Sequence, residues 1–182
     1  VRVRAVQKLG VAGSPKAAAA LLRVLELQDE VVHQTALTGL GSVGPALLKP
    51  AMEHLRSGVS ARQLAGAEGL GVLQAGAAAA LPALLETLNS PTSEVRVRCL
   101  EAIGRLGTHA AEAVEPLTEV LNSSHHREVA AAATALGQIG PESKSSVPRL
   151  MALVGHLEKD VRDAAADALG KIGPITRVFI PT

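Results

Sequence analysis

The stretch from Val161 to Gly173, VRDAAADALGKIG, decides the fold, because versions of it recur along the chain. The clearest other copy runs from Val95 to Gly107 and reads VRVRCLEAIGRLG. Both copies place apolar or small residues at the spacing of one face of an α-helix, and both end in a glycine. The chain is therefore predicted to be built from repeated helical units.

A glycine column measures the length of these units. Consecutive glycines stand 30 to 33 residues apart, at Gly10, Gly41, Gly71, Gly104, Gly137 and Gly170. A glycine inside a helix costs about 1 kcal/mol relative to alanine. Its recurrence indicates that the missing side chain lets a neighbouring helix approach closely. Tandem helical units of this length are typical of solenoids.

Each unit is predicted to be a helical hairpin. The first helix ends at a second glycine, which is often followed by proline, as at Gly140-Pro141. The candidate caps at its start are Asp29, Ser60, Ser93 and Asp160, and Ser60 with Gln63 has the spacing of a capping box. A second helix opens near Pro50, Pro82, Pro116 or Pro148. The third unit departs most from the pattern, with Arg62, Gly66, Ala67 and Gln74.

These units predict an all-α fold, an α-solenoid of about six stacked helical hairpins whose last repeat is truncated. The composition agrees, because 47% of residues are hydrophobic but only 1% are aromatic, so Ala, Leu and Val must form the core. The hairpins are predicted over about residues 1–28, 29–59, 60–91, 92–124, 125–158 and 159–182, in one solenoid. Ile180-Pro181-Thr182 matches the start of a second helix. We therefore expect a piece of a longer array, with self-association through uncapped ends as a further possibility.

With these columns in view, the chain resembles the HEAT-like repeats of the phycobilisome-lyase type. Their units read V-R-x-x-A-A-x-A-L-G-x-I-G and are followed by a short second helix opened by proline, a pattern that both copies quoted above fit. The resemblance spans the whole chain. It implies a solenoid with first helices on the convex side and second helices lining a concave side. Such arrays serve as scaffolds and adaptors and, less often, as parts of enzymes.

Charge and composition narrow the classes of partner. The formal net charge is +1, so no overall positive field favours nucleic acid. The longest uncharged stretches are interrupted by glycine, proline and polar residues, which predicts no membrane span. A single cysteine, Cys99, cannot form an internal disulfide, so a cytoplasmic location is expected.

The sequence offers no arrangement of residues that indicates catalysis. His125 and His126 are adjacent, so on a helix they would point about 100° apart and could not face one metal ion. Cys99 stands in a column of small residues, which favours packing over a role as a nucleophile. We therefore predict that the chain is not an enzyme and uses no cofactor or metal.

The candidate binding residues are glutamates of the predicted second helices. Glu86 and Glu119 share one column, and nearby positions complete a set of Glu26, Glu53, Glu86, Glu112, Glu115 and Glu119. They would line a mildly acidic concave groove, although an ordinary solvated face explains the same pattern. The leading prediction is a non-catalytic scaffold or adaptor that binds an extended segment or a helix of another protein.

Two other functions stay open at this point. One is an accessory subunit of a bilin lyase or a related modifying enzyme, which would bind bilin. The other is nucleic-acid binding through the arginines of the first helices, which would weaken steeply with salt.

Overall fold

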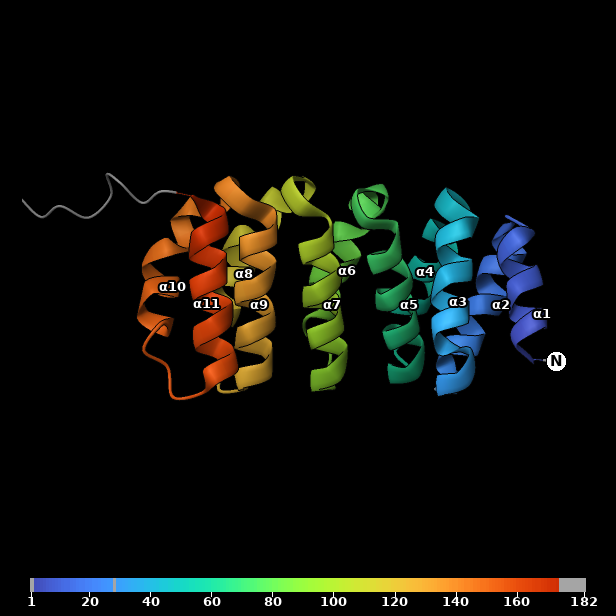
Figure 1. Cartoon of the computed structure of the whole chain (residues 1–182), viewed down its shortest axis with the longest axis horizontal. Coiled ribbons are helices and arrows are strands. Elements are labelled where there is room, and N and C mark those ends of the chain that lie inside the picture. The colour runs from blue at the N-terminus through green and yellow to red at the C-terminus, as the bar shows by residue number, and fades with distance from the viewer. Residues whose placement is uncertain (1, 28, 174–182) are drawn as a thin grey trace, which may run out of the picture.

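The computed structural model describes residues 2–27 and 29–173, and within these residues the secondary structure is entirely helical. The helices follow one another in a row along the longest axis of the molecule (Figure 1). The predicted all-α solenoid is therefore confirmed. The predicted second-helix start at Ile180-Pro181-Thr182, and with it the truncation of the last repeat, lies outside the described residues.

The solenoid has two layers of helices. The first-helix layer consists of α1 (Arg2–Val11), α3 (Glu30–Val43), α5 (Ser60–Leu73), α7 (Ser93–Arg105), α9 (His126–Ile139) and α11 (Lys159–Ile172). The second-helix layer consists of α2 (Pro15–Glu26), α4 (Leu48–Leu55), α6 (Leu81–Thr87), α8 (Val114–Val120) and α10 (Val147–Leu153). Figure 1 shows the first-helix layer in front, with α1 at one end of the row and α11 at the other.

The first helices end where the glycine pattern predicts. Gly44 and Gly140 take φ values of 62° and 79°, a left-handed conformation that stops a helix. Gln74 holds the same place in the third repeat with φ 48°, and it is the one non-glycine residue of the described chain with positive φ.

A 3₁₀ segment then leads into four of the second helices: η1 (Gly44–Leu47), η2 (Gln74–Ala80), η3 (Gly107–Ala113) and η4 (Gly140–Ser146). These segments were not predicted, because over so few residues an apolar pattern does not distinguish three from 3.6 residues per turn.

The core lies between the two layers and runs without a break from repeat to repeat. The apolar residue before the column glycine is fully buried in the inner repeats, as at Leu40, Leu70 and Leu136. The same position is only partly buried in the outermost repeats, at Leu9 and Leu169. Each repeat thus buries its apolar faces against its neighbours, as a solenoid requires.

One stretch, Ser60–Thr87, is long and apolar enough to cross a membrane by length and composition, with a mean hydropathy of 1.3 in its best window. In the fold this stretch comprises α5, η2 and α6, and the backbone turns at Gln74. Leu70 and Leu84 are fully buried in the core. The stretch is therefore a folded hairpin and not one straight helix.

The helix caps were predicted only in part. Asp29 caps α3, because its carboxylate accepts a hydrogen bond of 3.1 Å from the Val31 N–H. The caps of α5 and α7 are instead Val59 and Thr92, one residue before the predicted Ser60 and Ser93. The cap of α11 is Glu158, so the predicted Asp160 lies inside the first turn.

The predicted capping box of Ser60 and Gln63 is wrong. The Ser60 hydroxyl forms a hydrogen bond of 2.8 Å with the Thr92 hydroxyl of the next repeat. The Gln63 side chain donates to the Leu55 carbonyl at 3.2 Å. These polar side chains therefore link helices and repeats to one another, because partners from neighbouring repeats compete with the local backbone for their hydrogen bonds.

Candidate functional site

The predicted glutamates lie on successive elements of the second-helix layer and its approach. Glu26 is in α2, Glu53 in α4, Glu86 in α6, Glu112 in η3, and Glu115 and Glu119 in α8. All of them except Glu26 are exposed, and none of these exposed five forms an ion pair with a side chain that the structure describes. We call these five residues the glutamate row.

Glu26 is set apart from the row by its partners. Its carboxylate lies 2.9 Å from His54 Nε2 and 3.6 Å from Arg62 Nε. His54 is in α4 and Arg62 is in α5, so Glu26 ties α2 to two later helices. These contacts indicate a structural role for Glu26, because its carboxylate is already occupied.

Several arginines of the first helices are paired with carboxylates and are therefore not free to bind phosphate groups. Arg2 pairs with Asp29 at 3.1 Å, and Arg96 pairs with Glu128 at 2.6 Å. Arg98 reaches three carboxylates, those of Glu68, Glu94 and Glu101, at 3.1 to 3.5 Å. The first-helix layer therefore carries both signs of charge, which weakens the case for nucleic-acid binding through these arginines.

The ion pair between Arg96 and Glu128 is the most buried of these links. The Glu128 side chain is only 7% exposed, and Oε1 accepts hydrogen bonds of 2.6 Å from both Arg96 and Ser93. Burial by itself would raise the pKa of Glu128, but these hydrogen bonds outweigh it and hold the pKa below its usual value. The three side chains, which we call the Glu128 lock, join α7 to α9.

The arginine of the recurring V-R pair has a second structural role. Arg96 donates to the Ser90 carbonyl at 2.6 Å, and Arg162 donates to the carbonyls of His156 and Leu157 at 2.8 and 2.7 Å. These carbonyls lie in the loops that precede α7 and α11, so the arginine holds each loop to the helix that follows. The recurrence of V-R in the sequence is the signal for this role.

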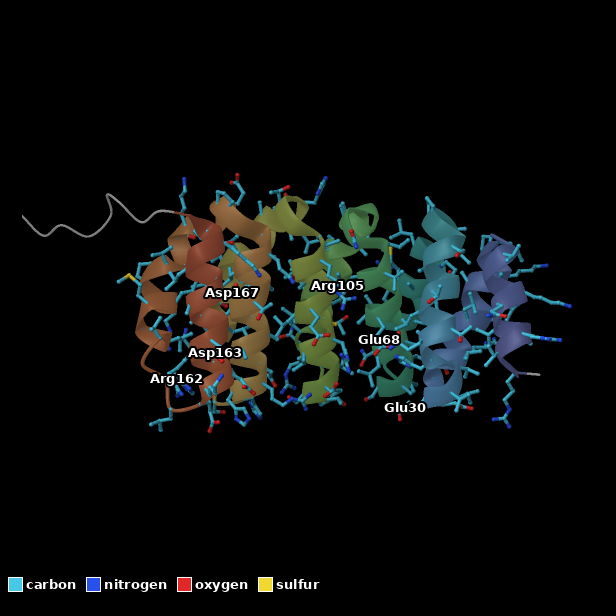
Figure 2. All side chains as sticks on the ribbon, in the orientation of Figure 1. Glu30, Glu68, Arg105, Arg162, Asp163 and Asp167 are labelled. Carbon is cyan, nitrogen blue, oxygen red and sulfur yellow. The ribbon has the colours of Figure 1, made fainter. Side chains whose placement is uncertain are left out.

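A cleft between α3, α5 and α7 is a surface feature that the sequence did not predict. It consists of two adjoining hollows of about 320 and 270 Å³ in the first-helix layer. Both hollows are lined by His33, Gln34, Glu68 and Arg98. Figure 2 shows Glu30 and Glu68 on the same face of the molecule, on α3 and α5.

The cleft exists because α5 lies close to the second-helix layer. A Cβ atom on Gly66 would lie 2.7 Å from the Ala51 carbonyl oxygen of α4, and one on Gly69 would lie 2.9 Å from Leu22 Cδ2 of α2. Among the described helices, α5 is the one first helix with extensive contacts to the second helix two repeats earlier. The two glycines allow this approach, and the outer side of the α3–α5 junction is left open.

Glu68 stands at the centre of the cleft. Its side chain is 18% exposed, and its carboxylate lies 3.5 Å from both His33 Nε2 and Arg98 Nε. Hydrogen bonds between nitrogen and oxygen are usually 2.7 to 3.2 Å long. These two long contacts therefore leave much of the acceptor capacity of the Glu68 carboxylate unused.

The described residues do not form a metal centre or an accessible thiol. No group of three or more metal-ligating side chains occurs among residues 2–27 and 29–173. Cys99 is fully buried, and burial raises its pKa to about 12, so the thiol stays protonated near neutral pH. The predicted packing role of Cys99 agrees with this burial.

Comparison with known protein families gives one match. A family model described as HEAT repeats matches residues 48–137 and 130–178. A search of the curated proteins gives no match to the chain.

Three solved structures illustrate the likeness in fold. A designed armadillo repeat protein in complex with the peptide (KR)4 is 16% identical, with 94% of this chain and 91% of that chain covered and a TM-score of 0.65. An engineered protein is 21% identical, with coverages of 93% and 90% and a TM-score of 0.64. The structure of computationally designed armadillo repeat proteins for modular peptide recognition is 17% identical, with 94% of this chain and 92% of that chain covered and a TM-score of 0.62. At these identities the likeness shows the fold alone.

Proposed function

The chain belongs to the HEAT-repeat family, and on this premise we propose that it is a non-catalytic scaffold that binds a basic, extended segment of another protein along its second-helix layer. Stacked helical repeats present long continuous surfaces, which are typical of protein-interaction scaffolds. The family match is to HEAT repeats in general, so the phycobilisome-lyase type and the cytoplasmic location stay predictions.

The glutamate row is the observation that carries this proposal. Glu53, Glu86 and Glu119 come from three successive second helices, and all three are exposed. A single exposed ion pair contributes only about 0.2–1 kcal/mol. Several carboxylates in a row can bind a chain of lysine and arginine side chains, because the small contributions add up along the solenoid.

The armadillo structure supports the same kind of ligand. That designed protein is in complex with (KR)4, a peptide of alternating lysine and arginine, and its fold is similar to that of this chain. That complex is an example of a basic peptide bound to a helical-repeat solenoid, and the glutamate row offers this chain a surface of complementary charge.

Peptide binding to charge-neutralised variants tests the proposal. A fluorescein-labelled (KR)4 peptide is titrated with the wild-type protein, with the double variant Glu86→Gln/Glu119→Gln, and with the double variant Asp163→Asn/Asp167→Asn as control. Each double variant removes two exposed carboxylates, but Asp163 and Asp167 lie on α11 in the first-helix layer (Figure 2). Anisotropy then separates the effect of position from the effect of net charge.

We expect Kd to rise about twofold to thirtyfold for the glutamate variant and less than about twofold for the aspartate variant, since two lost pairs correspond to about 0.4–2 kcal/mol. Equal weakening in both variants would mean that only net charge matters. Wild-type protein that does not bind the peptide at low salt would leave the glutamates as an ordinary solvated face. Either result would refute the proposal.

A further inference from the structure

The cleft between α3, α5 and α7 has the lining of a binding site, and it opens on the layer opposite the glutamate row. Its larger hollow, of about 320 Å³, has apolar walls from Leu25, Leu64 and Ala65. From these features we propose that the cleft is a second binding site, which takes an arginine side chain of a partner protein.

The charge of the hollow favours a cation. Three carboxylates, those of Glu30, Glu68 and Glu94, line it together with His33 and Arg98. Glu94 is paired with Arg98 and, at 3.2 Å, with Arg127, so Glu30 and Glu68 are the carboxylates that face a further cation. Glu30 is exposed, and it forms no ion pair with a described side chain. The long contacts of Glu68 leave room for a further donor, because neither contact is within the usual hydrogen-bond distance.

The combination of apolar walls and carboxylates fits arginine in particular. An arginine side chain has an aliphatic stem that packs on apolar surface and a planar guanidinium that can bind carboxylates with two parallel hydrogen bonds. The stem of an incoming arginine would lie against Leu25 and Leu64, and its guanidinium would approach Glu30 and Glu68. Arg98 already shows that a guanidinium is accommodated beside Glu68 and Glu94, at 3.5 and 3.2 Å.

Two glycines at these positions occur together in α5 alone among the described first helices. The position of Gly66 holds Cys99, Ala132 and Ala165 in the later first helices, whereas the position of Gly69 holds glycine in α3, at Gly39, and Ala102, Ala135 and Ala168 in the later first helices. Glycine weakens a helix relative to alanine. Its presence twice in α5, where it permits close contact with α4 and α2, keeps the outer side of α3 and α5 apart.

Nuclear magnetic resonance titration with a small probe tests the site directly. N-acetyl-arginine methylamide is added to ¹⁵N-labelled protein, and N-acetyl-norleucine methylamide, which has a stem without charge, is added to a second sample. We expect saturable shifts of the amides of Glu30, His33, Glu68 and Arg98 with the arginine probe and no such shifts with norleucine. Glu68→Gln should weaken binding of the arginine probe at least about fivefold, and Glu30→Gln provides a second variant at an exposed position.

Asp163→Asn is the matched control, because it removes an exposed carboxylate from the same layer on α11 and should leave probe binding unchanged. Glu86→Gln/Glu119→Gln should also leave it unchanged, so this test is independent of the glutamate row. The proposal is refuted by the absence of saturable shifts, by equal shifts with norleucine, or by folded Glu68→Gln and Glu30→Gln proteins that bind the probe as tightly as wild type.

Discussion

The packing of α9 against α11 differs from the packing of α3 against α5, although both pairs join the first helices of neighbouring repeats. A Cβ atom on Gly137 of α9 would lie 2.7 Å from the Cα atom of Ala168 on α11. At the equivalent Gly41 of α3, the nearest atom is a side-chain carbon of Val72, at 3.3 Å. The same glycine column therefore permits backbone contact at one junction and leaves an open cleft at the other.

The difference shows that a repeat column does not by itself set the distance between helices. Ala168 leaves α11 free to pack directly on Gly137. Gly66 and Gly69 allow α5 to pack more closely on α4 and α2, which takes α5 away from α3. The altered third repeat changes the packing of α5 on α3, α4 and α2, whereas α9 and α11 keep their close contact.

The polar links show the same contrast. The Glu128 lock joins α7 to α9 through hydrogen bonds of 2.6 Å to a carboxylate that is 7% exposed. The link between α3 and α5 is the His33–Glu68 contact of 3.5 Å, with side chains that are 28% and 18% exposed.

Loss of the Glu128 carboxylate should have the largest effect. Glu128→Gln should lower the free energy of unfolding by about 2–3 kcal/mol, because a charged and buried hydrogen-bond acceptor is replaced by a neutral amide. Urea denaturation measures the change. Glu68→Gln, at the open junction, serves as the comparison, and equal losses for the two variants would contradict the contrast.

Substitution in the glycine column should come second. Gly137→Ala should lower the free energy of unfolding by about 1–2 kcal/mol, because the new Cβ atom overlaps the backbone of α11. The control is Gly170→Ala, where nothing lies within 4 Å and the helix should gain up to about 1 kcal/mol. Thermal and urea unfolding of both variants would show opposite signs, and a loss of equal size in both would refute close approach as the reason for the column.

Acidic pH should lower the contribution of the Glu128 lock to stability, by less than either substitution above. The pKa of Glu128 is lower in the folded protein than in the unfolded chain, so its contribution to stability is complete above the unfolded pKa of about 4.3 and is lost as the pH falls through the folded pKa. Between pH 6 and pH 3, wild type should therefore lose more stability than Glu128→Gln. Parallel pH profiles for the two proteins would show that the carboxylate is not stabilised by folding.

Removal of the His33 side chain should have the smallest effect. His33→Ala should change the free energy of unfolding by less than about 0.5 kcal/mol, since a long and partly exposed polar contact contributes little. Urea denaturation near neutral pH measures this change. A loss comparable with that of Glu128→Gln would mean that the α3–α5 junction is as firmly joined as α7 and α9.

The helices, buried positions and helix ends within each repeat could be predicted from the sequence, whereas the contacts between repeats could not. The column glycines, the buried leucines such as Leu70 and the helix-ending glycines follow from local periodicity and backbone geometry. The Glu128 lock was missed because Ser93 has the chemistry of a helix cap, and its partner comes from the next repeat. The unusual residues of the third repeat were noted, but the cleft depends on contacts of Gly69 with Leu22, two repeats away.

The glutamate row was predicted better than the cleft for the same reason. Exposed positions on a helix follow from its apolar stripe, so five of the six predicted glutamates lie on the surface of the second-helix layer and its approach. Glu26 differs because His54 and Arg62 come within reach only after the hairpins stack. Stacking is the part of the structure that local periodicity does not contain.

Hydrogen exchange of backbone amides most directly tests whether the α3–α5 junction is packed less tightly than the α9–α11 junction. Helices α3 and α9 suit the comparison, because in the first-helix layer each lies next to the outermost helix, α1 or α11. We predict that the most protected amides of α3 exchange at least about tenfold faster than those of α9, a difference of about 1.4 kcal/mol in opening free energy. Equal protection in the two helices, or slower exchange in α3, would contradict the account.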